Sequence, residues 1–296
     1  MLLGASVMMP GLYKLACRHR KLNSVTGMVE RDRTSPMSLS SDDFQPVRDF
    51  RVAMMFLTRI PTGRIRDLAS DDLSRAAWAF PLVGLVVGVI AGGALYLSAE
   101  TDVSPIVCAL IALAVQAAVT GALHEDGLAD LADGLGGHDK AKILAIMRDS
   151  RIGTYGVLAL IFSVGLRATM IAGIPGPGVA FAVLLAAAAF SRGALPLVMN
   201  LMPAARADGL AQAAGRPERR IAMLAMGIGT LTLFTLLPFS VALAAVVIGG
   251  VLAAGIIFWA HQRLGGQTGD VLGALQQVLE IAVLCGAAAW SSAYYV

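Results

Sequence analysis

The sequence predicts an all-α fold, a polytopic integral membrane bundle of about seven transmembrane helices. Of its 296 residues, 57% are hydrophobic and 15% charged, whereas a soluble domain has about 45–50% and about 25%. The 32 glycines and 6% aromatic residues are typical of helices that pack closely through small residues in lipid. Soluble and disordered classes are thereby disfavoured. The net charge of +3 is too small to indicate a nucleic-acid partner.

The N-terminal segment differs in kind from the rest. Its basic residues follow the apolar stretch 1–13, whereas a secretory signal carries them before it. Residues 23–46 are rich in Ser, Asp, Thr and Arg. We expect residues 1–45 to form a disordered extension and residues 46–296 the membrane-embedded domain. The helical spacing of residues 47–60 fits an interfacial helix and a helix packed against the bundle equally well.

Apolar stretches close to the roughly 20 residues of a membrane-spanning helix occur seven times. The fifth and sixth are continuous, and we divide them at Pro238 because the whole stretch of about 40 residues is twice the length needed. The predicted spans are residues 80–98, 105–123, 153–173, 178–202, 221–237, 239–260 and 271–294.

Basic residues occur in every second connection between these spans. The loops 124–152 and 203–220 are rich in Lys and Arg, and Arg263 lies between the last two spans, whereas residues 99–104 and 174–177 contain neither. The positive-inside rule places the N-terminal region and the basic loops in the cytoplasm.

Three aspartates in the first basic loop indicate a metal site. Asp126, Asp130 and Asp133 are spaced i, i+4, i+7, which puts them on one face of a helix. Their mutual repulsion is relieved by a cation, and Mg²⁺ takes one or two carboxylates together with water and phosphate oxygens. We expect Gly127 and Gly134 to let substrate approach closely. A solvated acidic face is the competing interpretation.

Arg148, Asp149, Ser150 and Arg151 precede the third span. Arginine forks match phosphate oxygens, but arginines at a cytoplasmic mouth also anchor a membrane protein. The acidic cluster in the same loop makes phosphate binding the preferred hypothesis. His124 is interpreted as a base or ligand and, equally, as a supporting residue.

Ionisable residues inside predicted spans suggest further functional positions, because they are costly in lipid. Arg192 within the fourth span, Arg206 after it and Asp270 at the start of the seventh are predicted to contact substrate. Arg192 and Glu280 lie at comparable depth, so an ion pair between them is equally expected. Arg167 is interpreted as an interhelical partner or a snorkelling residue.

The run HEDGLADLADGLGG (124–137) followed by MRDSRIGTYG (147–156) resembles the signature of the cobalamin synthase family, the adenosylcobinamide-GDP ribazoletransferases. These are integral membrane enzymes of vitamin B12 assembly. The resemblance covers roughly residues 45–296. Further similar segments are FLTRIPTG (56–63), SRGALPL (191–197), ARADGL (205–210) and GDVLGALQQ (269–277).

The resemblance implies a reaction and a cofactor. The adenosylcobinamide phosphate group passes from adenosylcobinamide-GDP to α-ribazole, or its 5′-phosphate, and GMP leaves. Asp126, Asp130 and Asp133 would bind Mg²⁺ or the pyrophosphate. From position alone we assign catalytic roles to His124, Asp133, Arg148, Asp149 and Arg151, with His124 or one aspartate accepting the hydroxyl proton.

The family's setting is the bacterial cytoplasmic (inner) membrane, with the active site facing the cytoplasm and the lipid bilayer around the spans. A homo-oligomer and contacts with other cobalamin-assembly enzymes are compatible with the resemblance.

Two other functions were weighed. A CDP-alcohol phosphatidyltransferase also uses spaced aspartates, but its D-G-x-x-A-R pattern is not met, since Leu128, Ala129 and Asp130 follow Gly127. A divalent-cation transporter would place acids near the bilayer midplane and often has repeated halves. Here the acids lie at the mouth of a span and no repeat is found.

Overall fold

The computed structural model describes residues 45–65, 68–69, 71–206, 209, 212 and 214–293. The predicted N-terminal extension, except Gln45, lies outside them. The described residues form helices and no strand. Six helices are long and apolar enough to cross a membrane, and the bent pair α6–α7 makes a seventh if it is one span. The predicted all-α, multi-pass bundle is therefore confirmed.

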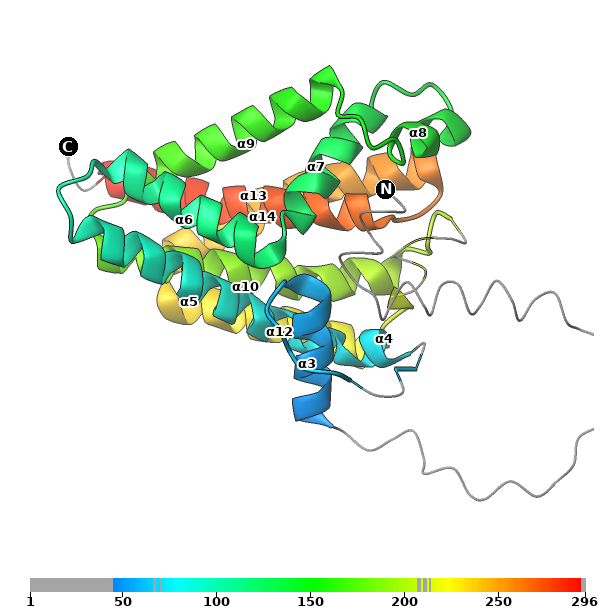
Figure 1. The fold of residues 1–296 in the computed structure, drawn as a ribbon, viewed down its shortest axis with the longest axis horizontal. Coiled ribbons are helices and arrows are strands. Elements are labelled where there is room, and N and C mark those ends of the chain that lie inside the picture. The colour runs from blue at the N-terminus through cyan, green and yellow to red at the C-terminus, as the bar shows by residue number, and fades with distance from the viewer. Residues whose placement is uncertain are drawn as a thin grey trace, which may run out of the picture.

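The helices run roughly alongside one another, and α7 and α8 lie at the end of the bundle where α14 begins (Figure 1). Their bounds are α3 (Pro46–Leu57), α4 (Asp72–Ala76), the 3₁₀ helix η1 (Ala77–Ala79), α5 (Phe80–Ala99), α6 (Pro105–Thr120), α7 (Leu123–Gly134), α8 (Lys140–Ile146), α9 (Thr154–Ala172), α10 (Pro177–Leu201), α12 (Arg219–Leu236), α13 (Phe239–Leu264) and α14 (Gly269–Ala293).

Prolines set several helix boundaries. Pro105 and Pro177 lie in the first turn of α6 and α10. A backbone N–H in the first turn has no acceptor within the helix, so its absence in proline costs no hydrogen bond. Pro238 separates α12 from α13, as the sequence predicts. The remaining boundaries also lie close to those expected, except in the second span.

The second predicted span, residues 105–123, ends earlier than its hydropathy suggests. Gly121 (φ 67°) and Ala122 (φ 55°) both adopt the left-handed conformation, which cannot continue a right-handed helix. The chain therefore leaves α6 and enters α7 at an angle of 91°. The segment 124–152, predicted as a loop, consists largely of the helices α7 and α8.

Small residues let the helices approach one another closely, as the composition predicts. A Cβ on Gly84 of α5 would collide with the carbonyl oxygen of Ala188 on α10. On the other side of α10, a Cβ on Gly193 would lie 2.8 Å from the carbonyl oxygen of Ala225 on α12. The central helix α10 is thus packed almost backbone to backbone with two neighbours.

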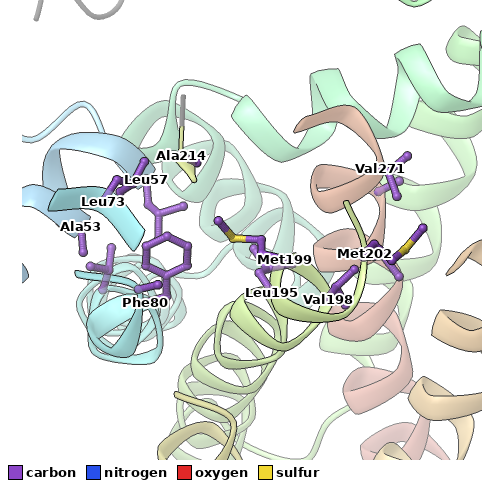
Figure 2. Packing of buried hydrophobic residues seen from close by; sticks show 14 of the residues in the cluster. Ala53, Leu57, Leu73, Phe80, Leu195, Val198, Met199, Met202, Ala214 and Val271 are labelled. Atoms are coloured by element: carbon purple, nitrogen blue, oxygen red, sulfur yellow. The ribbon is translucent and has the colours of Figure 1, made fainter. Parts of the chain in front are cut away.

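Buried apolar side chains form two clusters, one toward each end of the bundle. The first joins α3, α4, α5, α10 and α14 through residues such as Leu57, Phe80, Met199 and Val271 (Figure 2). The burial of α3 in this cluster makes it a helix packed against the bundle. The second cluster, with Phe190 among its members, includes Leu279, Val283 and Ala287, which lie farther along α14 than Val271 of the first cluster.

Replacement of Gly84 by alanine should destabilise the protein. The added Cβ has no space against the backbone of α10, and such overpacking costs about 1–3 kcal/mol. Gly93→Ala is the matched control, because its Cβ would meet no atom within 4 Å on the same helix. Thermal unfolding of the detergent-purified variants should give a lower midpoint for Gly84→Ala alone. Equal midpoints would contradict the close α5–α10 contact.

Candidate active site

The three predicted aspartates lie on one helix, α7, as their spacing requires for a shared face. Asp126 is exposed, and Asp130 and Asp133 are half-buried. Since α7 lies at the end of the bundle where α9 and α14 begin (Figure 1), these three carboxylates, the acidic stripe, lie at this end, which is named the mouth.

Asp130 is the member at which charges from other elements converge. Its carboxylate interacts electrostatically with Asp126, Asp133 and Asp270, and with the guanidinium of Arg206. Arg206 and Asp270 also pair with each other at 3.6 Å between Nη2 and Oδ2. The structure therefore brings together five of the predicted residues from three parts of the chain.

Hydrogen bonds between the loop after α10 and the residues before α14 hold Arg206 close to Asp270. The backbone N–H of Ala205 donates to the carbonyl of Gln267, and that of Gln267 donates to Pro203, each at 2.8 Å. Thr268 donates from its hydroxyl to Asp270 at 3.2 Å. These bonds tie the loop after α10 to the beginning of α14, so the position of Arg206 is fixed relative to Asp270.

Asp133 has a contact that the sequence did not suggest. Its carboxylate accepts the backbone N–H of Gly153 at 2.7 Å and that of Gly156 at 2.8 Å. These amides stand at the N-terminus of α9, where N–H groups lack partners within the helix. Asp133 thus fastens the beginning of α9 to the end of α7, and its predicted metal and catalytic roles stay predictions.

The predicted phosphate-binding segment lies at the surface. Arg148, Ser150 and Arg151 are exposed. Arg151 donates from Nη2 to Asp149 at 2.7 Å and from Nε at 3.1 Å, and these bonds lower the pKa of Asp149 to about 2. A phosphate on Arg151 would therefore have to compete with an ionised carboxylate already in place.

Arg192 is fully buried and does not reach the mouth. Its Nη1 lies 3.2 Å from Glu280 of α14, which confirms the expected ion pair. Arg167 of α9 pairs with Glu280 at 3.3 Å, so it is an interhelical partner. Gln116 of α6 donates to both oxygens of Glu280 at 2.8 Å. Four helices thus share one buried carboxylate.

His124 also lies inside the bundle. It is 2% exposed, and its Nε2 is buried without a hydrogen-bond partner among the described residues. The charged groups that act on it are Arg192 and Arg167. Its predicted role as a base is untested, and the structure places it beside the buried arginines.

Gly127 and Gly134 are surrounded by protein. A Cβ on Gly127 would lie 3.0 Å from the Cα of Gly273 on α14, and one on Gly134 would lie 3.1 Å from Cγ of Met147. The contacts that the structure shows for both glycines are with packed helices. Their predicted contact with substrate stays a prediction.

The acidic stripe is suited to a magnesium ion that is bound jointly by protein carboxylates and substrate phosphate oxygens. In the described parts of the chain, no three His, Cys, Asp or Glu side chains are grouped so as to hold a metal ion. Mg²⁺ in phosphoryl-transfer sites needs only one or two carboxylates, since phosphate and water complete its shell. Asp130 offers a suitable ligand, because its Oδ2 is buried without a partner among the described residues.

Polar residues of the buried network were not assigned to the site from the sequence. These are Glu125, which stands beside the three aspartates, and Gln116, which lies within an apolar span. A glutamine in the middle of a membrane helix was the available signal. The partners of Glu125 lie on α9 and α14, far along the chain, which a single sequence does not reveal.

Comparison with known proteins settles the family. The family model described as cobalamin-5-phosphate synthase matches residues 49–288. The chain belongs to this family. The match includes α7 and every candidate residue discussed above. No solved structure matches the chain.

Proteins named adenosylcobinamide-GDP ribazoletransferase are similar over most of the chain. The protein of Bradyrhizobium diazoefficiens is 45% identical over 246 residues, covering 82% of this chain and 94% of the relative. That of Rhizobium etli strain CIAT 652 is 43% identical over 258 residues, covering 82% and 98%. That of Brucella anthropi is 41% identical over 241 residues, covering 78% and 92%.

Asp133→Ala should loosen the beginning of α9, because the amides of Gly153 and Gly156 lose their acceptor. Loss of a capping acceptor typically costs about 0.5–2 kcal/mol. Hydrogen exchange followed by mass spectrometry should show faster exchange across these amides. Asp139→Ala, which removes the cap of α8, should leave them unchanged. Unaltered exchange in Asp133→Ala would contradict the capping role.

Proposed function

We propose that this chain transfers the adenosylcobinamide phosphate group from adenosylcobinamide-GDP to α-ribazole, or its 5′-phosphate, and releases GMP. The observation that carries the proposal is the convergence of Asp126, Asp130, Asp270 and Arg206 at the mouth of the bundle. These residues lie within a chain 41–45% identical to proteins named for this transfer.

The reaction is a displacement at phosphorus. A ribose hydroxyl oxygen forms a bond to the phosphorus attached to adenosylcobinamide, and the bond from that phosphorus to the bridging oxygen of the diphosphate breaks. GMP leaves with the bridging oxygen, and the hydroxyl proton passes to a base. Such a reaction depends mainly on positioning and on neutralising negative charge.

Asp126 and Asp130 are the residues that we expect to hold Mg²⁺. Bound there, the ion would neutralise the diphosphate oxygens and stabilise departing GMP. Asp130 carries a buried oxygen without a partner among the described atoms. Two carboxylates without an ion would repel the diphosphate, so we expect the acidic stripe to bind the diphosphate only when Mg²⁺ is bound.

Arg206 is the cation best placed for the diphosphate. It interacts with Asp130 and Asp270, and its Nη1 is buried without a hydrogen-bond partner among the described residues. A guanidinium with an unused N–H is suited to a phosphate oxygen. Arg148 and Arg151 stay candidates for the outer part of the substrate, because they lie at the surface.

The setting that we propose is the bacterial inner membrane with the mouth facing the cytoplasm. The helix α8, which carries Lys140 and Lys142, lies at this end of the bundle (Figure 1), and residues 203–205, next to Arg206, are hydrogen-bonded to Gln267 before α14, as the positive-inside rule requires. GTP-derived intermediates are made on that side. We further propose that the protein associates with a second copy or with other cobalamin-assembly enzymes.

Purified membranes containing this protein should form cobalamin and GMP from adenosylcobinamide-GDP and α-ribazole when Mg²⁺ is present. Chelation by EDTA should abolish product formation, because the carboxylates then stay uncompensated. Re-addition of Mg²⁺ should restore it. Equal turnover with and without the chelator would exclude the metal, and no GMP release under any condition would contradict the proposed transfer.

Asp130→Asn should reduce turnover by about 100-fold or more, as expected when a metal ligand and its charge are lost. The asparagine is nearly isosteric, so membrane insertion and detergent-extracted yield should match the wild type. Asp139→Asn is a matched control, since Asp139 is an exposed acid that caps α8. Retained activity in Asp130→Asn would move the metal site elsewhere.

A further inference from the structure

Glu125 connects the helix that carries the acidic stripe to the buried network. Its Oε1 accepts from Nε2 of Gln277 at 3.1 Å and from Nη2 of Arg167 at 3.5 Å. Arg167 also donates from Nη1 to Glu280 at 3.3 Å. One guanidinium on α9 therefore joins α7 to α14.

This contact is shielded from water. The side chain of Arg167 is 2% exposed and that of Glu125 13%. An ion pair in such surroundings is screened far less than one at the surface. Removal of either partner leaves the other charge buried and incompletely compensated, so the pair strongly favours the arrangement in which both side chains meet.

The position of Glu125 on α7 means that its contact with Arg167 affects the rotation of α7 about the helix axis. Neighbouring residues of an α-helix are about 100° apart around its axis. While Glu125 points to Arg167, Asp126 is exposed and Ala129 is 4% exposed. A rotation of α7 would turn Asp126 and Asp130 away from their present direction together, because they lie one turn apart.

Besides the contacts of Glu125, the N-terminal half of α7 meets α14 through the backbone of His124 and Gly127, against Asp270 and Gly273. The left-handed pair Gly121–Ala122 separates α7 from α6, so the two are not one continuous helix. Gly127 meets Gly273 backbone to backbone, and a contact between two glycines has no interlocking side chains. Asp133 holds only the far end, at α9.

We propose that Glu125 and Arg167 are positioning residues, whose buried contact sets the rotation of the N-terminal half of α7 and thereby directs Asp126 and Asp130 toward the mouth. The consequence for Mg²⁺ and diphosphate rests on the proposed function. The rotation itself does not.

Cysteine reporters on α7 test the rotation directly. In a background with Cys17, Cys108 and Cys285 replaced by serine, Asp126→Cys and Ala129→Cys are introduced separately. A hydrophilic maleimide should label position 126 of the detergent-purified protein much faster than position 129. Arg167→Met and Glu125→Gln should each lower the 126:129 rate ratio by roughly tenfold, because loss of a buried ionic partner is large enough to shift a local equilibrium this far.

Two further variants separate rotation from general damage. Arg167→Lys keeps the charge and should recover most of the labelling ratio. Trp78→Phe removes a hydrogen bond outside this network, between η1 and α3, in which Nε1 donates to Asp49 at 3.0 Å, and it should leave the ratio unchanged. An unchanged ratio in Arg167→Met and Glu125→Gln would overturn the proposal. Should Arg167→Met not accumulate, the nearly isosteric Glu125→Gln decides alone.

Enzyme kinetics supply an independent readout with Asp126 intact. Glu125→Gln should raise the Mg²⁺ concentration for half-maximal turnover by roughly tenfold, as is usual for residues that orient metal ligands, and Trp78→Phe should not. A fall in turnover without a change in Mg²⁺ dependence would contradict positioning of Asp126 and Asp130. Labelling requires no turnover, so an inactive wild-type protein would refute the proposed function while leaving the rotation testable.

Discussion

The architecture depends on one buried carboxylate, that of Glu280. An ionised carboxylate in an apolar interior is very unfavourable unless donors surround it. Here Gln116, Arg167 and Arg192 supply them from α6, α9 and α10, so every compensating bond is also a contact between helices. Loss of one charged partner would cost about 3–5 kcal/mol. The helices therefore have one favourable arrangement around α14, and the second cation of the network, Arg167, extends that arrangement to α7.

The charged residues near α14 form two groups with different roles. At the middle of α14, between the two apolar clusters, two arginines and two glutamates compensate one another and are closed to solvent. At the beginning of α14 the balance differs, because several carboxylates interact around Asp130 with Arg206 as the opposing charge. The first set stabilises the bundle. The second retains an excess of negative charge, which is the property expected of a site that binds a cation together with a phosphate ester.

Much of this could be predicted from the sequence, since hydropathy and loop charge depend on local residues. The spans, the break at Pro238 and the pair Arg192–Glu280 follow from local patterns and similar depth. The bend after α6 did not, because Ala122 in the left-handed conformation is unfavourable for its residue type and is imposed by the surrounding structure. The cap that Asp133 gives α9 and the contacts of Glu125 also escaped prediction. Each joins residues at least 20 positions apart, and such contacts are fixed by helix packing.

In our proposal, the buried network around Glu280 and Arg167 orients α7 so that Asp126 and Asp130 bind a divalent cation beside the diphosphate. Electron paramagnetic resonance of Mn²⁺, titrated into the purified protein with adenosylcobinamide-GDP but no ribazole, measures this binding directly. We expect one saturable Mn²⁺ site in the wild type and in Asp139→Asn, and binding weakened by at least roughly tenfold in Asp126→Asn and Asp130→Asn. Binding of equal affinity in all four proteins would contradict it.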